Sequence, residues 1–345
     1  MWSATSRSVR TTIHSRVFRP SVASDAGEGG GPLFRRFPSL SAIPRVALGR
    51  FPTPIEPLAA LSPTLWIKRD DLGATLLGGN KLRALEFLLA GVGPGSRVVT
   101  VGSAGSTHAL AVATYASALG ARTIVGRWRQ EMNETAARVA TRIERTADET
   151  RIFGSPPGAY LWAWQRAAGA RWIAAGGSTP LGILGHVNAG LELVEQIQTG
   201  VAPAPATVVV PLGTGGTAAG LAVAFAIAGV DIRVVGVRVV PWIVGRRGHI
   251  LRLARRTVAL ISRTIGADVP AVRRDAVQVV HEAYGGAYGR ETPAARAAAT
   301  RLSETAGVRL DATYSAKAFE VALGLASGGP VLFWLTFDSR LLDRP

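Results

Sequence analysis

The sequence contains no cysteine, and only three of its 39 basic residues are lysines: Lys68, Lys81 and Lys317. The absence of cysteine excludes disulfide bonds, thiolate metal sites and cysteine nucleophiles. Histidine is scarce as well, and the five histidines lack the spacing of a metal site. We therefore expect no bound metal, and the lack of cysteine is consistent with a cytoplasmic protein.

Long hydrophobic runs suited to crossing a membrane are also missing. Residues 196–230 carry no charged side chain, but prolines (Pro203, Pro205, Pro211) and several glycines divide this stretch into short pieces. A strand, a glycine-rich turn and a buried helix explain it better than a transmembrane helix does. We expect no membrane association.

Acidic residues are few, 23 against 39 Lys+Arg, so the formal net charge is +16. Such a balance raises the question of nucleic-acid binding. The arginines, however, are spread along the chain apart from clusters at 246–247 and 252–256, and no basic run is interleaved with aromatic residues. We expect a solvated basic surface, no nucleic-acid partner and a homodimer. We assign the basic helix expected at 249–265 to a solvated face or to the contact surface of that dimer.

Residues 1–35 are rich in serine and arginine and contain no acidic residue before Asp25. A transit peptide to an organelle, a disordered tail and a start codon assigned too early are three interpretations that stay open for this stretch. We leave it out of the fold prediction. The rest of the 345-residue chain is long enough, and with 48% hydrophobic residues apolar enough, for one large or two medium domains.

Strand and helix patterns alternate along this remainder. Strands are expected at 65–68, 97–101, 122–125, 151–153, 172–174, 207–211, 233–239, 277–280 and 331–335, and helices at 108–119, 133–146, 158–168, 185–197, 218–228, 249–265, 293–304 and 317–325. This alternation predicts an α/β fold with open, mostly parallel sheets flanked by helices.

We interpret Lys81 as the residue around which the rest of the chain is arranged. It follows Gly78-Gly79-Asn80 and opens an apolar helical pattern. In a chain that strongly favours arginine, a retained lysine suggests chemistry that arginine cannot perform, since an amine can lose its proton and attack a carbonyl. Lys81 is therefore a candidate Schiff-base lysine for an aldehyde cofactor. An ordinary surface lysine at a helix start is the alternative.

The second motif is a glycine-rich loop, Gly213-Thr214-Gly215-Gly216-Thr217, between a buried valine-rich strand and a helix. The backbone N–H groups of such a loop and the helix N-terminus cradle a phosphate. The loop has neither the lysine of the P-loop nor the spacing of the dinucleotide fingerprint. A tight turn without a ligand is the alternative. An imine-forming lysine and a phosphate cradle together are what pyridoxal 5'-phosphate requires.

Several stretches also carry a resemblance to a known family. In order, and spanning about residues 50 to 336, they are Ile67-Lys68-Arg69-Asp70-Asp71-Leu72, Gly78-Gly79-Asn80-Lys81-Leu82-Arg83 with Glu86-Phe87-Leu88, Ser106-Thr107-His108, Gly176-Gly177-Ser178, Gly213 to Thr217, and Asp311-Ala312-Thr313-Tyr314-Ser315-Ala316-Lys317. In these stretches the chain resembles the D-cysteine desulfhydrase and 1-aminocyclopropane-1-carboxylate deaminase family, within the tryptophan-synthase-β-like group (fold type II) of pyridoxal-phosphate enzymes.

The resemblance implies roles for individual residues. Lys81 would bind the cofactor covalently and move the substrate α-proton, and Asn80 would hold the oxygen of the cofactor ring. Gly213, Thr214, Gly215, Gly216 and Thr217 would bind the phosphate, and Thr336 would meet the pyridine nitrogen. Ser106 would lie near Lys81 and the substrate carboxylate as a proton relay, with Thr107 and His108 in the same loop, and Tyr314 would face the substrate from the other side.

The implied activity is a deaminating lyase that acts on a small amino acid such as D-cysteine and releases a 2-oxo acid, ammonia and sulfide. Three positions depart from the family pattern. Thr107 replaces an asparagine, Phe337-Asp338 replace two glycines after Thr336, and Ser315 replaces the glutamate of the deaminase branch, which argues against ring-opening deaminase activity. A racemase, a dehydratase, a deaminase of the cyclopropane type, and a non-catalytic protein that binds pyridoxal phosphate or an amino acid remain alternatives.

The resemblance further implies two domains with the cofactor in the cleft between them. We expect a larger domain from residues 36–91 and 196–345, and a smaller open α/β domain from residues 92–195. Trp162 and Trp164 are expected to pack in the core or to form a wall on the substrate side. We expect Lys68 to pair with Asp70 or Asp71.

Overall fold

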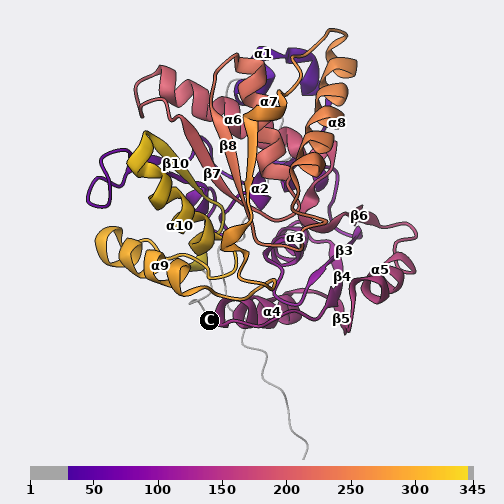
Figure 1. Cartoon of the computed structure of the whole chain (residues 1–345). Coiled ribbons are helices and arrows are strands. Elements are labelled where there is room, and N and C mark those ends of the chain that lie inside the picture. Colours follow the sequence, from indigo (N-terminus) through magenta and orange to yellow (C-terminus); the bar gives the residue numbers. More distant parts are fainter. Residues whose placement is uncertain (1–29, 341–345) are drawn as a thin grey trace, which may run out of the picture.

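The computed structural model describes residues 30–340, and Figure 1 shows two sheets, each with helices packed around it. The six-stranded sheet has the order β1-β2-β10-β7-β8-β9, and the four-stranded sheet has the order β5-β4-β3-β6. The strands are β1 (Ile55–Pro57), β2 (Leu65–Arg69), β3 (Arg97–Ser103), β4 (Arg122–Trp128), β5 (Glu149–Phe153), β6 (Arg171–Ile173), β7 (Thr207–Leu212), β8 (Arg233–Arg238), β9 (Val277–Val280) and β10 (Val331–Leu335).

Every strand pairing is parallel except that of β1 with β2. The predicted α/β fold with open, mostly parallel sheets is therefore confirmed. The sequence analysis missed β1, a three-residue edge strand that ends in Pro57. A proline cannot donate to a strand ladder and is tolerated only at such an edge, so the strand left little signal in the sequence.

The helices are α1 (Pro32–Arg36), α2 (Lys81–Leu88), α3 (Thr107–Ala118), α4 (Glu134–Thr146), α5 (Pro156–Trp164), α6 (Pro180–Gln198), α7 (Gly216–Ala228), α8 (Arg247–Ile265), α9 (Pro293–Ala306) and α10 (Ser315–Leu325). Helix α6 begins five residues earlier than predicted. Thr179 caps it by accepting a hydrogen bond from the Gly182 N–H, and Pro180 occupies the first turn, a combination that starts many helices.

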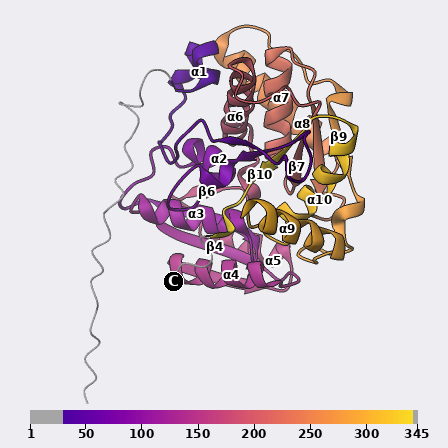
Figure 2. The same ribbon diagram turned by 90° about the vertical axis from the view of Figure 1, so that its left-hand side faces the viewer.

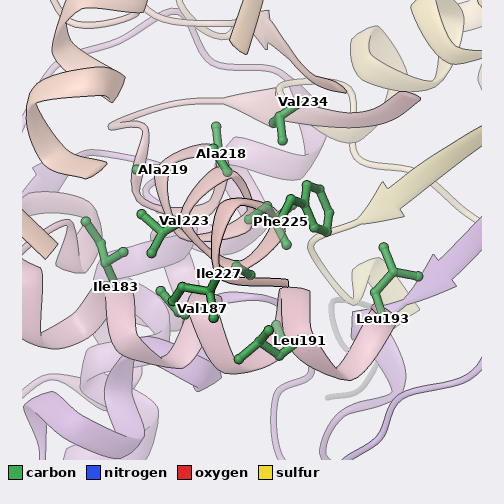
Figure 3. Packing of buried hydrophobic residues seen from close by; sticks show 14 of the residues in the cluster. Ile183, Val187, Leu191, Leu193, Ala218, Ala219, Val223, Phe225, Ile227 and Val234 are labelled. Carbon is green, nitrogen blue, oxygen red and sulfur yellow. The ribbon is translucent and has the colours of Figure 1, made fainter. Parts of the chain in front are cut away.

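The main core lies between the six-stranded sheet and the helices α6, α7 and α8. Figure 3 shows Ile183, Val187 and Leu191 of α6 facing Val223 and Ile227 of α7. The two helices approach closely because glycines lie in their contact: a Cβ on Gly220 would come within 2.3 Å of the His186 Cβ. This packing fixes the start of α7, where the glycine-rich loop ends.

Residues 30–35 form part of the fold, contrary to the expectation of a tail. Leu33 and Phe34 of α1 are buried, and the Phe34 ring stacks on Phe87 of α2 with centroids 6.1 Å apart. Figure 2 shows α1 beside α6. Residues 1–29, on which the rest of that expectation falls, lie outside the described residues.

Helix α6 contacts α7 and α2 rather than the four-stranded sheet. We therefore propose that the smaller domain ends near residue 174 instead of residue 195. Between residues 30 and 340, no helix is long and apolar enough to span a membrane.

Candidate active site

A cavity of about 690 Å³ opens between the two sheets, at the carboxyl ends of their parallel strands. Open α/β sheets bind ligands at this edge. All twelve site residues predicted from the sequence line the cavity: Asn80, Lys81, Ser106, Thr107, His108, Gly213, Thr214, Gly215, Gly216, Thr217, Tyr314 and Thr336. The structure therefore brings together residues that are up to 256 positions apart in the sequence, although their chemical roles stay predictions.

Two glycines place Lys81 at the start of α2. A Cβ on Gly78 would lie 1.8 Å from the Asp71 carbonyl oxygen, and Gly79 has a φ of +125° with the Thr336 carbonyl oxygen 2.5 Å from its hypothetical Cβ. The glycines thus allow close contact with neighbouring backbone. They join the end of β10 to the start of α2, and this places Thr336 and Lys81 on one wall.

The Lys81 amine is half-buried and, within the described chain, has no ion-pair or hydrogen-bond partner. Removal from bulk water lowers its pKa from 10.5 to about 8. His108 lies close by, and its Nε2 is 3.2 Å from the Thr100 Oγ1. Burial and the nearby Lys81 charge lower the pKa of His108 to about 3, so its imidazole is neutral and adds no charge to the cavity.

The glycine-rich loop meets the requirements for holding a phosphate. Gly215 is the N-cap of α7 with a φ of +87°, and no side chain caps the helix. The first N–H groups of a helix have no intrahelical acceptor, so those of α7 remain available for an anion. Ser178 braces the loop, since its Oγ lies 2.6 Å from the Thr214 Oγ1.

Asn80 and Thr336 connect the lysine to this loop. The Asn80 side-chain amide donates to the Thr217 Oγ1 at 2.7 Å, and its backbone N–H donates to the Thr336 carbonyl oxygen at 3.1 Å. Phe337, one of the two residues that replace the family's glycines after Thr336, lines the cavity, forms an isolated bridge with Gly79 and packs in the apolar cluster around Leu82 and Leu85. The chain after Thr336 therefore turns toward α2.

Ser106 and Thr107 lie where the cavity meets α3. The Ser106 Oγ accepts a hydrogen bond from the Ala109 N–H at 3.2 Å, so it caps the helix in addition to lining the cavity. Both residues are more than nine-tenths buried. This capping bond orients the Ser106 hydroxyl.

Tyr288 is a cavity residue that the sequence analysis missed. Its hydroxyl is hydrogen-bonded to that of Tyr314, and the two rings meet edge to face with centroids 5.9 Å apart. Burial raises the pKa of both phenols. The only sequence signal was a tyrosine within the glycine-rich segment 285–289, whose relation to Tyr314 depends on tertiary structure.

The expected aromatic wall consists of different residues. Trp162 is buried beneath the four-stranded sheet with Val99 and Val101, and Trp164 is 70% exposed. Neither lines the cavity, whereas Trp128 and Tyr160 do.

A buried ionic cluster anchors α2. Arg83, two residues after Lys81, donates to Asp70 at 2.7 Å and to Glu192 of α6 at 2.9 Å, and Lys68 donates to Glu192 at 2.6 Å. Lys68 thus pairs across 124 residues, and the prediction that it pairs with Asp70 or Asp71 is wrong. The side chains of all four residues in this cluster are at most 4% exposed.

These observations test whether the residues fit pyridoxal phosphate. An uncapped helix N-terminus suits its phosphate, a half-buried amine of lowered pKa suits its aldehyde, and both line one cavity. The residues present therefore fit this cofactor.

Comparisons with known proteins agree with the geometry. Residues 46–336 match the family model of pyridoxal-phosphate dependent enzymes. The chain is 35% identical over 324 residues to nocardicin C-9' epimerase of Nocardia uniformis subsp. tsuyamanensis, covering 87% of this chain and 94% of that protein. It is 30% identical over 320 residues to D-cysteine desulfhydrase of Salmonella typhi, covering 85% and 94%. A crystal structure of an ACC deaminase homologue matches with a TM-score of 0.74 and 29% identity, covering 89% and 94%.

Proposed function

Because this chain belongs to the family of pyridoxal-phosphate-dependent enzymes, we propose that it removes the α-proton of an amino acid and then eliminates a β-substituent, releasing a 2-oxo acid and ammonia. The observation that carries the proposal is the Lys81 amine, which has no partner among residues 30–340 and a pKa of about 8, in one cavity with a phosphate cradle. At neutral pH such an amine exists partly as the free base, which proton abstraction requires.

Pyridoxal phosphate, when bound, supplies an aldehyde for the amino group and an electron-poor ring that takes up charge from the α-carbon. The backbone N–H groups of Gly215 and Gly216 and the hydroxyl of Thr217 would hold its phosphate. Lys81 Nζ would accept the α-proton. Thr336 would face the ring nitrogen, whereas Ser315 is fully buried and does not line the cavity. A neutral hydroxyl at the ring nitrogen suits elimination better than ring opening.

Epimerisation is a second candidate, and one observation favours it. The Tyr288–Tyr314 pair lines the same cavity as Lys81, so phenolic hydroxyls are available there as a second proton donor to the α-carbon. A relative that is 35% identical is itself named an epimerase. Both candidate reactions share the first step, loss of the α-proton to Lys81.

Exchange of the α-proton with solvent measures this shared step. Purified protein, loaded with pyridoxal phosphate, is incubated in D₂O with D- and L-cysteine and with S-alkyl cysteines, and α-proton exchange is followed by NMR. Release of 2-oxo acid and ammonia would support the lyase, and exchange with inversion of configuration would support the epimerase. Lys81→Arg serves as the matched variant, because arginine keeps the charge but cannot form an imine.

We expect the absorbance of lysine-bound pyridoxal in the wild type and its loss in Lys81→Arg. Absorbance without exchange for any amino acid would contradict catalysis and favour a ligand-binding protein. Retention of the absorbance in Lys81→Arg would show that another residue binds the cofactor, and the assignment of Lys81 would then be wrong.

A further inference from the structure

The cavity continues beyond the residues that the proposed reaction uses. Trp128, at the end of β4, and Tyr160, on α5, both line it, and their rings stack with centroids 6.1 Å apart and an interplanar angle of 17°. Neither ring belongs to the phosphate cradle or lies in the Lys81 segment. We refer to these two residues as the aromatic ledge.

Sheet register relates the ledge to the loop that carries Ser106. Trp128 pairs in register with Ser103 on the neighbouring strand β3, and the loop after Ser103 leads to Ser106. Adjacent strands lie about 4.8 Å apart, so Trp128 stands one strand away from that loop, toward the β5 edge of the four-stranded sheet. Lys81 and the ledge line the same cavity, so the side chain of a substrate held at Lys81 can extend to the ledge if it is long.

A third aromatic residue, Trp172, packs against the ledge. The Tyr160 ring also contacts Trp172 of β6, with centroids 6.4 Å apart. Although its ring makes these two contacts, Tyr160 is 40% exposed. A flat aromatic surface that is preorganised and only partly covered is suited to stacking against another ring.

Arg129 adds a charge beside the ledge. It directly follows Trp128, lines the cavity and is exposed. Within residues 30–340 its guanidinium has no ion-pair partner, whereas the next acidic residue, Glu131, is paired with Arg290 at 2.5 Å. Apart from Lys81, Arg129 is the only Lys or Arg side chain among the described residues that line the cavity, so it can pair with an anionic group of a ligand.

We propose that the substrate is an amino acid with a long side chain, whose aromatic ring stacks on Trp128 and Tyr160 and whose terminal carboxylate pairs with Arg129. The inference rests on the proposed function in one respect, that Lys81 acts at the α-carbon. A substrate as small as cysteine leaves the ledge and Arg129 uncovered. A cavity of about 690 Å³ lies within the range of roughly 300–1,000 Å³ typical of sites for larger ligands.

Three thioethers test this proposal: S-methylcysteine, S-benzylcysteine and S-(4-carboxybenzyl)cysteine. Calorimetry with the cofactor-loaded protein measures their affinity, and α-proton exchange in D₂O measures their reaction separately. We expect affinity to rise in the order methyl, benzyl, carboxybenzyl. An aromatic contact changes affinity by roughly 3- to 10-fold, and a solvated ion pair by up to about 5-fold.

Substitutions show which residues are responsible for the differences in affinity. Tyr160→Ala and Trp128→Leu are expected to weaken both benzyl compounds roughly 3- to 10-fold without changing the affinity for S-methylcysteine, and Tyr160→Phe should restore binding. Arg129→Gln should weaken only the carboxybenzyl compound. Trp164→Ala is the matched control, since Trp164 lies on the same helix, is 70% exposed and does not line the cavity.

Equal affinity of the wild type for the methyl and benzyl compounds would overturn the inference, whatever the exchange data show. So would an equal effect of Tyr160→Ala and Trp164→Ala. Absence of α-proton exchange with every compound, despite the expected order of affinities, would contradict the proposed reaction and leave the ledge established as a binding site.

Discussion

Replacement of Lys81 by methionine is expected to stabilise the protein in the absence of cofactor. The structure gives the Lys81 amine no partner among the described residues, and burial lowers its pKa from 10.5 to about 8. The difference between these two values corresponds to about 3 kcal/mol, at 1.36 kcal/mol for each factor of ten. Water in the cavity reduces this figure, so it is an upper limit for the gain.

The difference in stability between Lys81→Met and the wild type depends on pH. Below pH 8, Lys81 is charged in both the folded and the unfolded protein, and the folded state carries the full cost of burying the charge. Between pH 8 and 10.5 the folded protein has lost the proton and the unfolded chain has not, so wild-type stability rises with pH. The advantage of Lys81→Met should therefore be largest at pH 7 and disappear near pH 10.5.

Urea unfolding of the cofactor-free proteins, followed by tryptophan fluorescence at several pH values, measures this difference. Lys81→Arg is the matched comparison, because arginine stays charged throughout. Its stability relative to the wild type should fall between pH 8 and 10.5. A stability difference between Lys81→Met and the wild type that does not vary with pH would refute the reasoning, and so would a loss of stability at pH 7.

Two further predictions concern the anchoring of α2. Glu192→Gln leaves the buried Lys68 and Arg83 short of a countercharge and should lower the free energy of unfolding, measured in the same urea experiment, by about 3–5 kcal/mol. Glu195→Gln, at an exposed pair with Arg35, should change it by less than about 1 kcal/mol, and similar effects of the two substitutions would contradict the assigned burial. Gly79→Ala should lower the melting temperature and abolish cofactor absorbance, because Gly79 has a positive φ and lies against the Thr336 backbone. Gly324→Ala, at an open position in α10, should leave stability unchanged or raise it. A normal cofactor spectrum for Gly79→Ala would be evidence against this placement of Lys81.

The parts of the site that the sequence predicted correctly are local. The residue order around Lys81 and in the loop 213–217 predicts a helix start at each place, and α2 and α7 begin there. The phosphate-binding role of the loop stays a prediction. The missed features depend on partners far along the chain. Lys68 pairs with Glu192 and not with its sequence neighbours because α6 packs against α2. Tyr288 and Tyr314 form a hydrogen bond because the fold brings their segments together.

The same distinction explains the aromatic residues. Trp162 and Trp164 stood out in the sequence by composition alone, but their positions on α5 direct one into the core and the other into solvent. Tyr160, on the same helix, contacts the cavity together with Trp128 from another strand end. Which side of a helix faces a cavity depends on how the helix packs on the sheet, and the short α5 carries no clear amphipathic pattern to reveal it.

The loop 213–217 contains no lysine or arginine, so its hold on an anion relies on backbone N–H groups and hydroxyls. Such donors respond to the charge and size of a tetrahedral oxyanion and not to what is attached to it. Inorganic phosphate and sulfate should therefore compete with the cofactor for this loop. Purification in phosphate or sulfate buffer should then lower the fraction of the protein that is recovered in its cofactor-bound form.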